Sequence, residues 1–351
     1  MKKNRIIFVI TACMAVTAFA GCGSENKKNY DQAVQDLSQG NYDYALKEFT
    51  TAVSAGYKLA ESYRGAGIAQ FHLGNYQEAI ESFNNAFDSD KAGKALKKDI
   101  LSYRATAELQ AGLYDAAMAD CQTIAEDYSM DSNTWYLTGC VALAMDSYEE
   151  ASNDFTQAYS EKASYEMAIQ IYEAYLEHDM EADGTRYLEA ALKTEPKTAE
   201  DYCDRGQVYY YMDDYDNAVK ELTEAVSKDS TEGMLLLGRV YLAQGDTSNA
   251  RTMYQQYTTA ENSDPAEGYN GLALCDIADG SYDSALENIA SGLAADTTSD
   301  EMQDLLFNEI VAYEKKLDFA TALSKAQEYV NTFPDDKAAA KELTFLQSRT
   351  S

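Results

Sequence analysis

The sequence predicts an all-α solenoid, in which short antiparallel helical hairpins stack side by side. A short pattern recurs about every 34 residues through most of the 351-residue chain. Equivalent positions of the recurring segments hold small, aromatic or large apolar residues. Only 3 residues are proline, whereas Ala, Leu, Glu and Tyr are abundant, which favours helices over a loop-rich β fold. One solenoid therefore replaces the two or three domains that length alone would suggest.

The repeat is clearest around a turn-forming anchor residue. Gly40-Asn41-Tyr42-Asp43-Tyr44-Ala45 recurs 34 residues later as Gly74-Asn75-Tyr76-Gln77-Glu78-Ala79. Two residues after the anchor, seven of nine repeats have an aromatic residue, and five residues after it all nine have Ala or Gly. Most repeats also have Gly or Ala seven residues before the anchor and a large apolar residue nine residues after it. The nine anchors are Gly40, Gly74, Gly112, Asp146, Asp179, Asp213, Gly245, Gly280 and Leu317.

These positions have a physical explanation. Each repeat contains two helices of about twelve residues, separated by a tight turn at the anchor. The small residues let two helix axes come close, and the aromatic side chains fill the space beside that contact. One hairpin cannot bury its apolar face alone, so neighbouring hairpins stack, and the last one needs a cap. We predict about nine hairpins over residues 30–336, then a C-terminal capping helix and tail over 337–351.

The spacing and the residue types together resemble the tetratricopeptide repeat (TPR), whose period is 34 residues. The resemblance implies a right-handed α-solenoid that binds proteins or peptides in a concave groove, built from the first helix of each repeat. The family's carboxylate clamp is not expected, because it needs paired Lys, Arg and Asn, and only isolated Arg64 and Arg239 are present. The candidate groove residues are Tyr30, Arg64, Phe71, Tyr136, Glu173, Gln207, Tyr210, Tyr211, Arg239, Asn270 and Phe307.

Two functions fit this groove. The first is a non-enzymatic scaffold that binds other envelope proteins or peptides, because a mixed aromatic, aliphatic and charged groove suits an extended or helical peptide. The alternative is a binder of cell-wall glycan or exported polysaccharide, through a stacking face of Tyr30, Tyr136, Tyr210 and Tyr211. Salt separates them, since binding of a basic protein weakens with ionic strength and stacking on a neutral sugar does not.

An acidic series recurs thirteen residues before the anchors and has two interpretations. It would form a charged rail that selects a basic partner. Equally, it would occupy the first turn of each first helix, where carboxylates favour the positive end of the helix dipole by ~0.3–1 kcal/mol each. The series consists of Glu61, Asp99, Glu166, Glu200, Glu232, Glu267 and Asp304.

The overall charge excludes some partners. The chain has 28 Lys and Arg against 59 Asp and Glu, a formal net charge of −31. A protein this negative would repel a nucleic acid, and it would not lie flat on an anionic membrane surface. A basic partner is allowed but not required.

The N-terminus has the features of an export signal. A basic start, Met1–Arg5, precedes an apolar stretch, Ile6–Ala20, that is too short for a comfortable membrane span. The following Ala20-Gly21-Cys22 resembles the lipobox of bacterial lipoproteins, in which the Cys is acylated and becomes the mature N-terminus. We therefore expect a signal peptide at 1–21, lipidation of Cys22, a short tether at 22–29, and an extracytoplasmic protein held on a bacterial membrane by its lipid. An ordinary signal peptide or an uncleaved anchor helix would be the alternatives.

Residues for chemistry are scarce, so we predict no enzyme, no metal and no cofactor. The two histidines, His72 and His178, lie in different repeats, and His72 is expected to be solvated or in the groove. No nucleophile elbow, zinc motif or phosphate-binding loop is present. Asp88–Gly93 begins like a calcium loop, but Ala92 replaces a ligand and nearby lysines oppose a cation.

Several points stay open from the sequence alone. Cys121, Cys140, Cys203 and Cys275 are expected to be buried thiols, although Cys121 and Cys140 lie in adjacent repeats and could pair. The fifth repeat is degenerate, with Tyr172 at a small-residue position. It would be either a hinge or ordinary drift with compensating contacts. Partner identity, the membrane concerned and the oligomeric state do not follow from the sequence.

Overall fold

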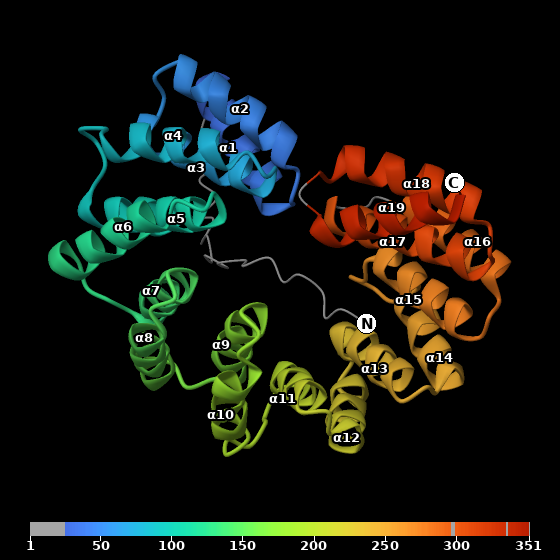
Figure 1. The fold of residues 1–351 in the computed structure, drawn as a ribbon. Coiled ribbons are helices and arrows are strands. Elements are labelled where there is room, and N and C mark those ends of the chain that lie inside the picture. The colour runs from blue at the N-terminus through green and yellow to red at the C-terminus, as the bar shows by residue number, and fades with distance from the viewer. Residues whose placement is uncertain (1–24, 296–298, 335, 351) are drawn as a thin grey trace. The chain divides into compact units, whose positions relative to one another are not determined.

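The computed structural model describes residues 25–295, 299–334 and 336–350, and within them every regular element is an α-helix (Figure 1). The predicted signal peptide and the predicted lipidation site, Cys22, lie outside the described residues. The all-α prediction is confirmed. The helices are α1 (Glu25–Ser38), α2 (Tyr42–Ser54), α3 (Leu59–His72), α4 (Tyr76–Phe87), α5 (Lys94–Gln110), α6 (Tyr114–Asp127), α7 (Ser132–Ala144), α8 (Tyr148–Glu161), α9 (Tyr165–Glu177), α10 (Glu181–Ala191), α11 (Ala199–Tyr211), α12 (Tyr215–Ser227), α13 (Thr231–Ala243), α14 (Thr247–Tyr257), α15 (Pro265–Ala278), α16 (Tyr282–Leu293), α17 (Ser299–Lys315), α18 (Phe319–Thr332) and α19 (Lys337–Thr350).

The chain forms two compact units, and the boundary lies in α10. Unit 1 is Met1–Tyr187 and unit 2 is Leu188–Ser351. In unit 1, α1 contacts α2, α3 contacts α4, α5 contacts α6 and α7 contacts α8. In unit 2, α11, α13, α15 and α17 each contact the even-numbered helix that follows. Odd-numbered helices also contact the next odd-numbered helix within each unit, so they form a continuous layer. We call its surface the odd-helix face.

The nine anchors explain the turn between the helices of each hairpin. Every anchor has a positive φ, from 57° at Asp146 and Asp213 to 79° at Gly245. Glycine adopts this left-handed conformation without steric cost, and Asp tolerates it better than most residues. Leu317 is the exception, with φ 66° and a side chain that is 73% exposed. Gly and Asp therefore recur at the anchors because the turn requires a left-handed backbone conformation there.

The predicted contact between small and large residues is confirmed inside the hairpins. A Cβ on Gly139 would lie 2.7 Å from the ring of Phe155, and one on Gly67 would lie 2.7 Å from the ring of Phe83. Gly206 faces Leu222 in the same way, at 2.5 Å. Each glycine thus leaves space that only a large side chain from the partner helix fills.

The degenerate fifth repeat departs from this arrangement on its first helix. Tyr172 is 3% exposed and occupies the position that holds Gly or Ala in most repeats. The partner helix compensates with Gly184, where an added Cβ would lie 2.9 Å from the Cα of Tyr172. The second helix keeps its large residue, Leu188, which is fully buried, and the close approach at Gly184 makes room for Tyr172, which supports drift with compensating contacts.

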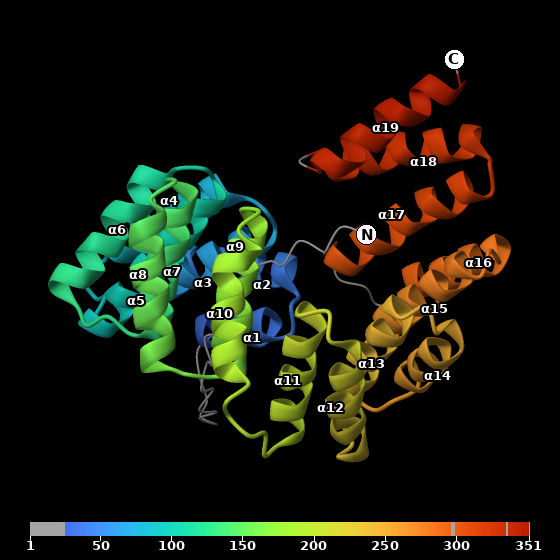
Figure 2. The same cartoon turned by 60° about the horizontal axis from the view of Figure 1, so that its bottom comes forward.

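The ends of the array differ in one detail from expectation. Helix α1 begins at Glu25, so residues 25–29, predicted to belong to the tether, are helical. At the other end α19 lies beside α18, as Figure 2 shows. Its Ala339 and Leu346 join a buried cluster with Ala322, Ala326 and Tyr329. This is the contact that a capping helix needs.

The part of the chain that the structure describes contains no helix long and apolar enough to cross a bilayer.

Candidate functional site

All eleven predicted groove residues lie on odd-numbered helices. Tyr30 is on α1, Arg64 and Phe71 on α3, Tyr136 on α7 and Glu173 on α9. In unit 2, α11 carries three of them, and α13, α15 and α17 carry one each. Those six are Gln207, Tyr210, Tyr211, Arg239, Asn270 and Phe307.

Unit 1 brings two of these residues into one cluster around a guanidinium. Arg64 forms an ion pair with Asp99 of α5 and lies 5.1 Å from the ring centre of Tyr103. Burial alone would lower the pKa of Arg64, but Asp99 raises it above its ordinary value. Burial, with a smaller contribution from Glu61, raises the pKa of Tyr30 to about 12. Arg64 is therefore a fixed charge that is already paired.

The sequence did not single out Tyr103 as part of this cluster. It lies nine residues before its anchor, one position away from the offset shared by Tyr30, Arg64 and Tyr136. Asp99 belongs to the acidic series, but its ion pair with Arg64 could be identified only from the structure. In unit 2, Asn308 was missed in the same way, since its side chain donates to Asn270 at 2.7 Å.

Three predicted groove residues are buried instead of facing a ligand. Phe71 is 8% exposed and belongs to the core of the first hairpins, where it contacts His72 and Tyr76. Tyr136 and Glu173 are each 7% exposed. These positions fill space between adjacent hairpins, so their prediction as groove residues is not supported.

The tyrosines predicted as a sugar-stacking face are engaged inside their own units. Tyr136 packs on Phe155, and its hydroxyl donates to the backbone oxygen of Gln170 at 3.3 Å. Tyr30 makes an edge contact with Phe49. Tyr210 packs against Tyr215. Of these residues Tyr136 is buried, and Tyr30 and Tyr210 are partly buried.

The ion pairs of the acidic series vary from one helix to the next. In unit 1, Asp99 pairs with Arg64, and Glu166 pairs with Lys162 at 2.8 Å. In unit 2, Glu200 and Glu232 have no Lys or Arg at ion-pair distance among the described residues. Among the described residues, the series is therefore paired only in part in both units, since Glu61 of unit 1 and Glu200 and Glu232 of unit 2 form no ion pair, whereas Asp99, Glu166 and Glu267 do.

The carboxylates of unit 2 lie close enough to repel one another. Burial and the charges of Glu200 and Glu267 raise the pKa of Glu232, and Arg239 opposes them. Arg239 reaches Glu267 at 3.8 Å with a half-exposed side chain. Glu267 also accepts a hydrogen bond from the Tyr257 hydroxyl at 2.5 Å. This part of the odd-helix face is a concentration of negative charge around one arginine.

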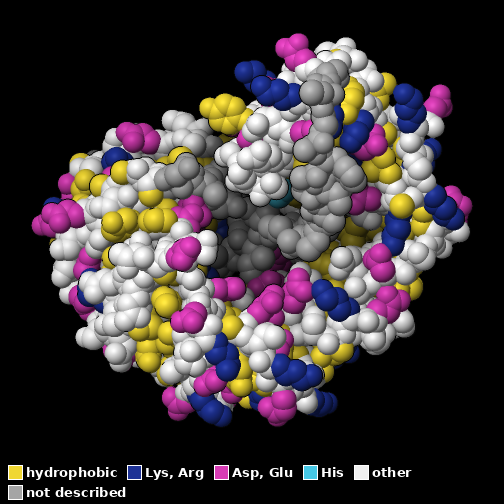
Figure 3. Space-filling model, turned by 180° about the vertical axis from the view of Figure 1, so that it is seen from behind, with side chains coloured by type: hydrophobic (Ala, Val, Ile, Leu, Met, Phe, Trp, Pro, Cys, Tyr) yellow, Lys and Arg dark blue, Asp and Glu magenta, His cyan; other side chains and the backbone are white. Residues whose placement is uncertain are grey.

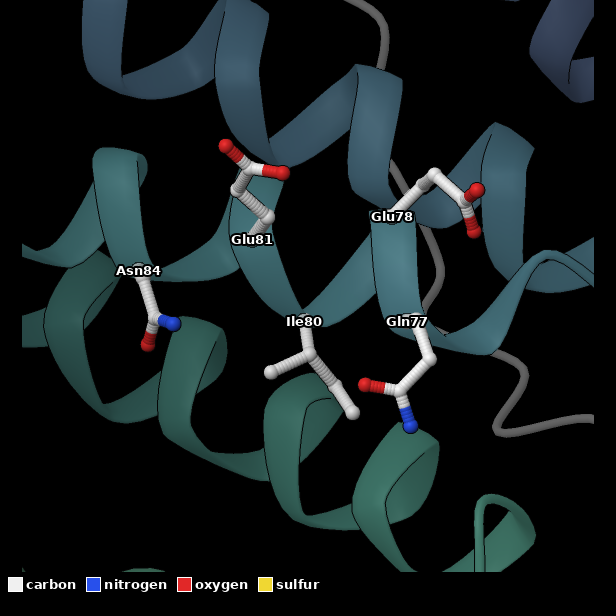
Figure 4. A pocket seen from close by; sticks show the side chains of 5 residues that line it. All are labelled: Gln77, Glu78, Ile80, Glu81 and Asn84. Atoms are coloured by element: carbon white, nitrogen blue, oxygen red, sulfur yellow. The ribbon is translucent and has the colours of Figure 1, made fainter.

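Other candidate features carry no chemistry of their own. A shallow depression is lined by side chains of α4 only, namely Gln77, Glu78, Ile80, Glu81 and Asn84, of which Ile80 points toward the neighbouring helix and Glu78 and Glu81 point away (Figure 4). His72 is half-buried, stacks on Tyr42 at 4.3 Å between ring centres, and has a pKa lowered by burial. Within the described residues no three His, Cys, Asp or Glu side chains gather as a metal site.

The four cysteines of the described chain are free and buried. Cys121 and Cys140, which could have paired, are not joined. Burial raises the pKa of the Cys121 thiol to about 12 and that of Cys203 to about 11. Thiols held in the neutral form are poor nucleophiles, so their role is to fill the core.

Comparison with known proteins agrees with this geometry. The family model described as tetratricopeptide repeat matches residues 30–94, 203–265 and 235–300. Over these stretches the chain is similar to tetratricopeptide repeats. The three matched stretches begin on α1, α11 and α13, each of which is the first helix of a hairpin. Tetratricopeptide repeats support a role as a scaffold that binds other proteins.

Similar proteins share parts of the sequence. The BBSome complex member BBS4 homolog of Drosophila melanogaster is 23% identical over 247 residues, which is 70% of this chain and 45% of that protein. Hsp70-Hsp90 organizing protein 2 of Arabidopsis thaliana is 23% identical over 223 residues, 59% of this chain and 36% of that protein. The chain thus spans less than half the length of these curated relatives. A solved tetratricopeptide repeat protein from Parabacteroides merdae is 17% identical, with a TM-score of 0.44, over 72% of this chain and 99% of that one.

Proposed function

We propose that this protein is a non-enzymatic TPR scaffold that is held on a bacterial membrane by a lipid on Cys22 and faces away from the cytoplasm. Its odd-helix face would bind other envelope proteins or peptides. The TPRs support protein binding, and the sequence of residues 1–22 supports the anchor. No catalytic constellation was found among the described side chains that would favour an enzyme.

The observation that carries the proposal is the group of three interacting carboxylates on unit 2, Glu200, Glu232 and Glu267, which has Arg239 as its one nearby cation among the described residues. Carboxylates that repel one another have raised pKa values, and a cationic partner would relieve that repulsion. Figure 3 shows Asp and Glu side chains interspersed with Lys and Arg over the face in view. A local excess of carboxylates over cations therefore distinguishes one part of the surface from the rest. This group of carboxylates favours a basic segment as the bound chain.

Proximity labelling of the intact lipoprotein in its own envelope tests the scaffold. We expect basic envelope proteins to be enriched over a lipidated control that lacks the repeats. The double variant Glu200→Gln/Glu232→Gln should lose most of this enrichment, because Gln keeps the size of Glu and only charge is removed. Labelling that does not differ from the repeat-free control would exclude the scaffold.

A matched variant controls for the general loss of charge. Glu224→Gln/Glu287→Gln removes two exposed carboxylates from α12 and α16, away from the odd-helix face. It should leave the enriched proteins unchanged. Captured complexes should dissociate as salt rises, since exposed charge pairs are screened within ~10 Å at 0.1 M. Binding that withstands salt would favour the glycan alternative, although the engaged tyrosines argue against it.

The anchor has an independent test. In cells fed a radiolabelled fatty acid, the wild type should become labelled and Cys22→Ser should not. The variant should then appear in the soluble fraction, because one or more acyl chains supply membrane affinity at about 0.8 kcal/mol per buried CH₂. Label that persists in Cys22→Ser would refute lipidation at this residue. That result would not affect the scaffold proposal, which proximity labelling tests separately.

A further inference from the structure

A second surface lies at the turns between hairpin helices of unit 1. We call it the turn patch, formed by Leu113, Tyr114, Met118, Met145 and Tyr148. Leu113 and Tyr114, at the start of α6, are 42% and 39% exposed, and Tyr148, at the start of α8, is 47% exposed. Large apolar side chains this exposed at adjacent turns need an explanation, whereas a single one would not.

The members of the turn patch share one floor. Met118 and Met145 are both partly buried against the same cluster, which contains Ala117, Cys121 and Val141. Tyr114 lies one helical turn before Met118, and Tyr148 follows Met145 by three residues. The two exposed tyrosines therefore each lie close in sequence to a methionine that packs on this one cluster. Met is also flexible and polarisable, so it adapts to a bound apolar side chain.

The rim of the turn patch is acidic. Asp115, Asp146, Glu149 and Glu150 are all exposed, and residues 110–118 and 144–152 contain no Lys or Arg. Asp146 accepts a hydrogen bond from the Tyr148 hydroxyl at 2.7 Å, which fixes that ring at the edge of the patch. Burial, with a smaller contribution from the charge of Glu150, raises the pKa of Asp154 to about 6.

Cations from neighbouring helices do not neutralise this rim. Arg186 of α10 reaches Ser152, one turn further along α8, and also bonds the Tyr187 hydroxyl. Arg104 of α5 is engaged with Asp120 and Asn84. Lys98 pairs with Asp131 before the start of α7, at the end opposite the turn patch. The patch thus combines an apolar floor with a negative rim.

We propose that the turn patch is a docking site for an amphipathic, Lys- and Arg-bearing segment of another polypeptide. Its apolar side chains would contact Leu113, Tyr114 and Tyr148, and its cations would pair with the rim. A second copy of this chain is disfavoured, because each copy carries a net charge of −31 and presents the same acidic rim. This site is distinct from the odd-helix face and does not depend on what that face binds.

The test uses the full-length protein and a labelled amphipathic helical peptide of Leu and Lys, with a Leu and Glu peptide as the negative probe. The variant Leu113→Ser/Tyr148→Ser should weaken binding of the Leu and Lys peptide at least about tenfold. Glu149→Lys/Glu150→Lys should weaken it similarly. Circular dichroism should match the wild type for both, since the changed side chains are exposed.

Control variants outside the turn patch show whether the loss of peptide binding is specific to that patch. Tyr44→Ser changes a tyrosine that is 68% exposed on α2, and Glu78→Lys/Glu81→Lys changes exposed carboxylates on α4. Both should bind the peptide like the wild type, and so should Glu200→Gln/Glu232→Gln on the odd-helix face. Equal binding by every variant, or no binding by the wild type, would overturn the proposal. So would self-association in sedimentation that Leu113→Ser/Tyr148→Ser abolishes, because the occupant would then be a second copy.

Discussion

Phe155→Ala should lower the free energy of unfolding of its unit by about 3–5 kcal/mol, the usual range for deleting a buried aromatic ring. Phe155 is fully buried on α8 and lies 5.1 Å from the ring of Tyr175 and 5.8 Å from that of Tyr136. Gly139 supplies the space for it on α7, so nothing else can fill the resulting cavity without moving a helix. The loss should therefore sit near the upper part of the range.

Urea denaturation followed by tryptophan fluorescence measures this change at the right place. The chain has one Trp, Trp135, which is on α7 beside Tyr136. In a repeat array each hairpin contacts mainly its neighbours, so a local probe reports local unfolding. Tyr44→Ala is the control, because its side chain is 68% exposed and its loss should change stability by no more than about 0.5 kcal/mol. Equal midpoints for the two variants would contradict the account of the hairpin contact.

The contact at Phe155 could be predicted from sequence because it is local. The seven-before and nine-after positions of one repeat are close in sequence, and the helical period fixes which side chains meet. The anchors were predictable for the same reason, since their left-handed backbone selects Gly and Asp. Burial of Tyr136 was not predictable, because it depends on Gln170 of the next repeat, 34 residues away.

Which carboxylates of the acidic series form ion pairs could also be learned only from the structure. Asp99, Glu166 and Glu232 occupy equivalent sequence positions, yet Arg64 neutralises the first, Lys162 the second, and no ion pair is formed by the third within the described chain. Whether a carboxylate is paired depends on long side chains from adjacent helices, and their direction is set by packing that periodicity does not encode. Sequence therefore located the odd-helix face but could not say which part of it remains charged.

Arg104 occupies the most highly bonded ionic site of unit 1. Its guanidinium donates to both carboxylate oxygens of Asp120, at 2.6 and 2.7 Å, and to the side-chain oxygen of Asn84 at 2.6 Å. Glu108 lies 3.9 Å away, and its Oε2 has no hydrogen-bond partner among the described residues. Asp120 and Glu108 are only 6% and 7% exposed. One cation thus serves two buried carboxyl groups.

The pKa of Glu108 makes this site sensitive to pH. Burial and the charge of Asp120 raise it from 4.5 to about 7, and Arg104 opposes them. The folded protein therefore keeps a proton on Glu108 that the unfolded chain releases above about pH 4.5. It follows by linkage that the contribution of Glu108 to stability is greatest below that pH and is lost as pH rises through about 7. Glu108→Gln should flatten this part of the pH profile.

Arg104→Met should cost about 3–5 kcal/mol at pH 8, because it leaves both carboxylates buried without a cation. At pH 5 the cost should be smaller, since Glu108 can take up a proton and lose its charge. Arg186→Met, which changes an exposed arginine of the same unit, should cost little at either pH. The triple variant Arg104→Met/Glu108→Gln/Asp120→Asn should recover much of the loss, as neutral groups no longer need the guanidinium. A penalty for Arg104→Met that is equal at both pH values would mean that Arg104 acts through its contact with the Phe87 ring, 5.4 Å away, and not through charge.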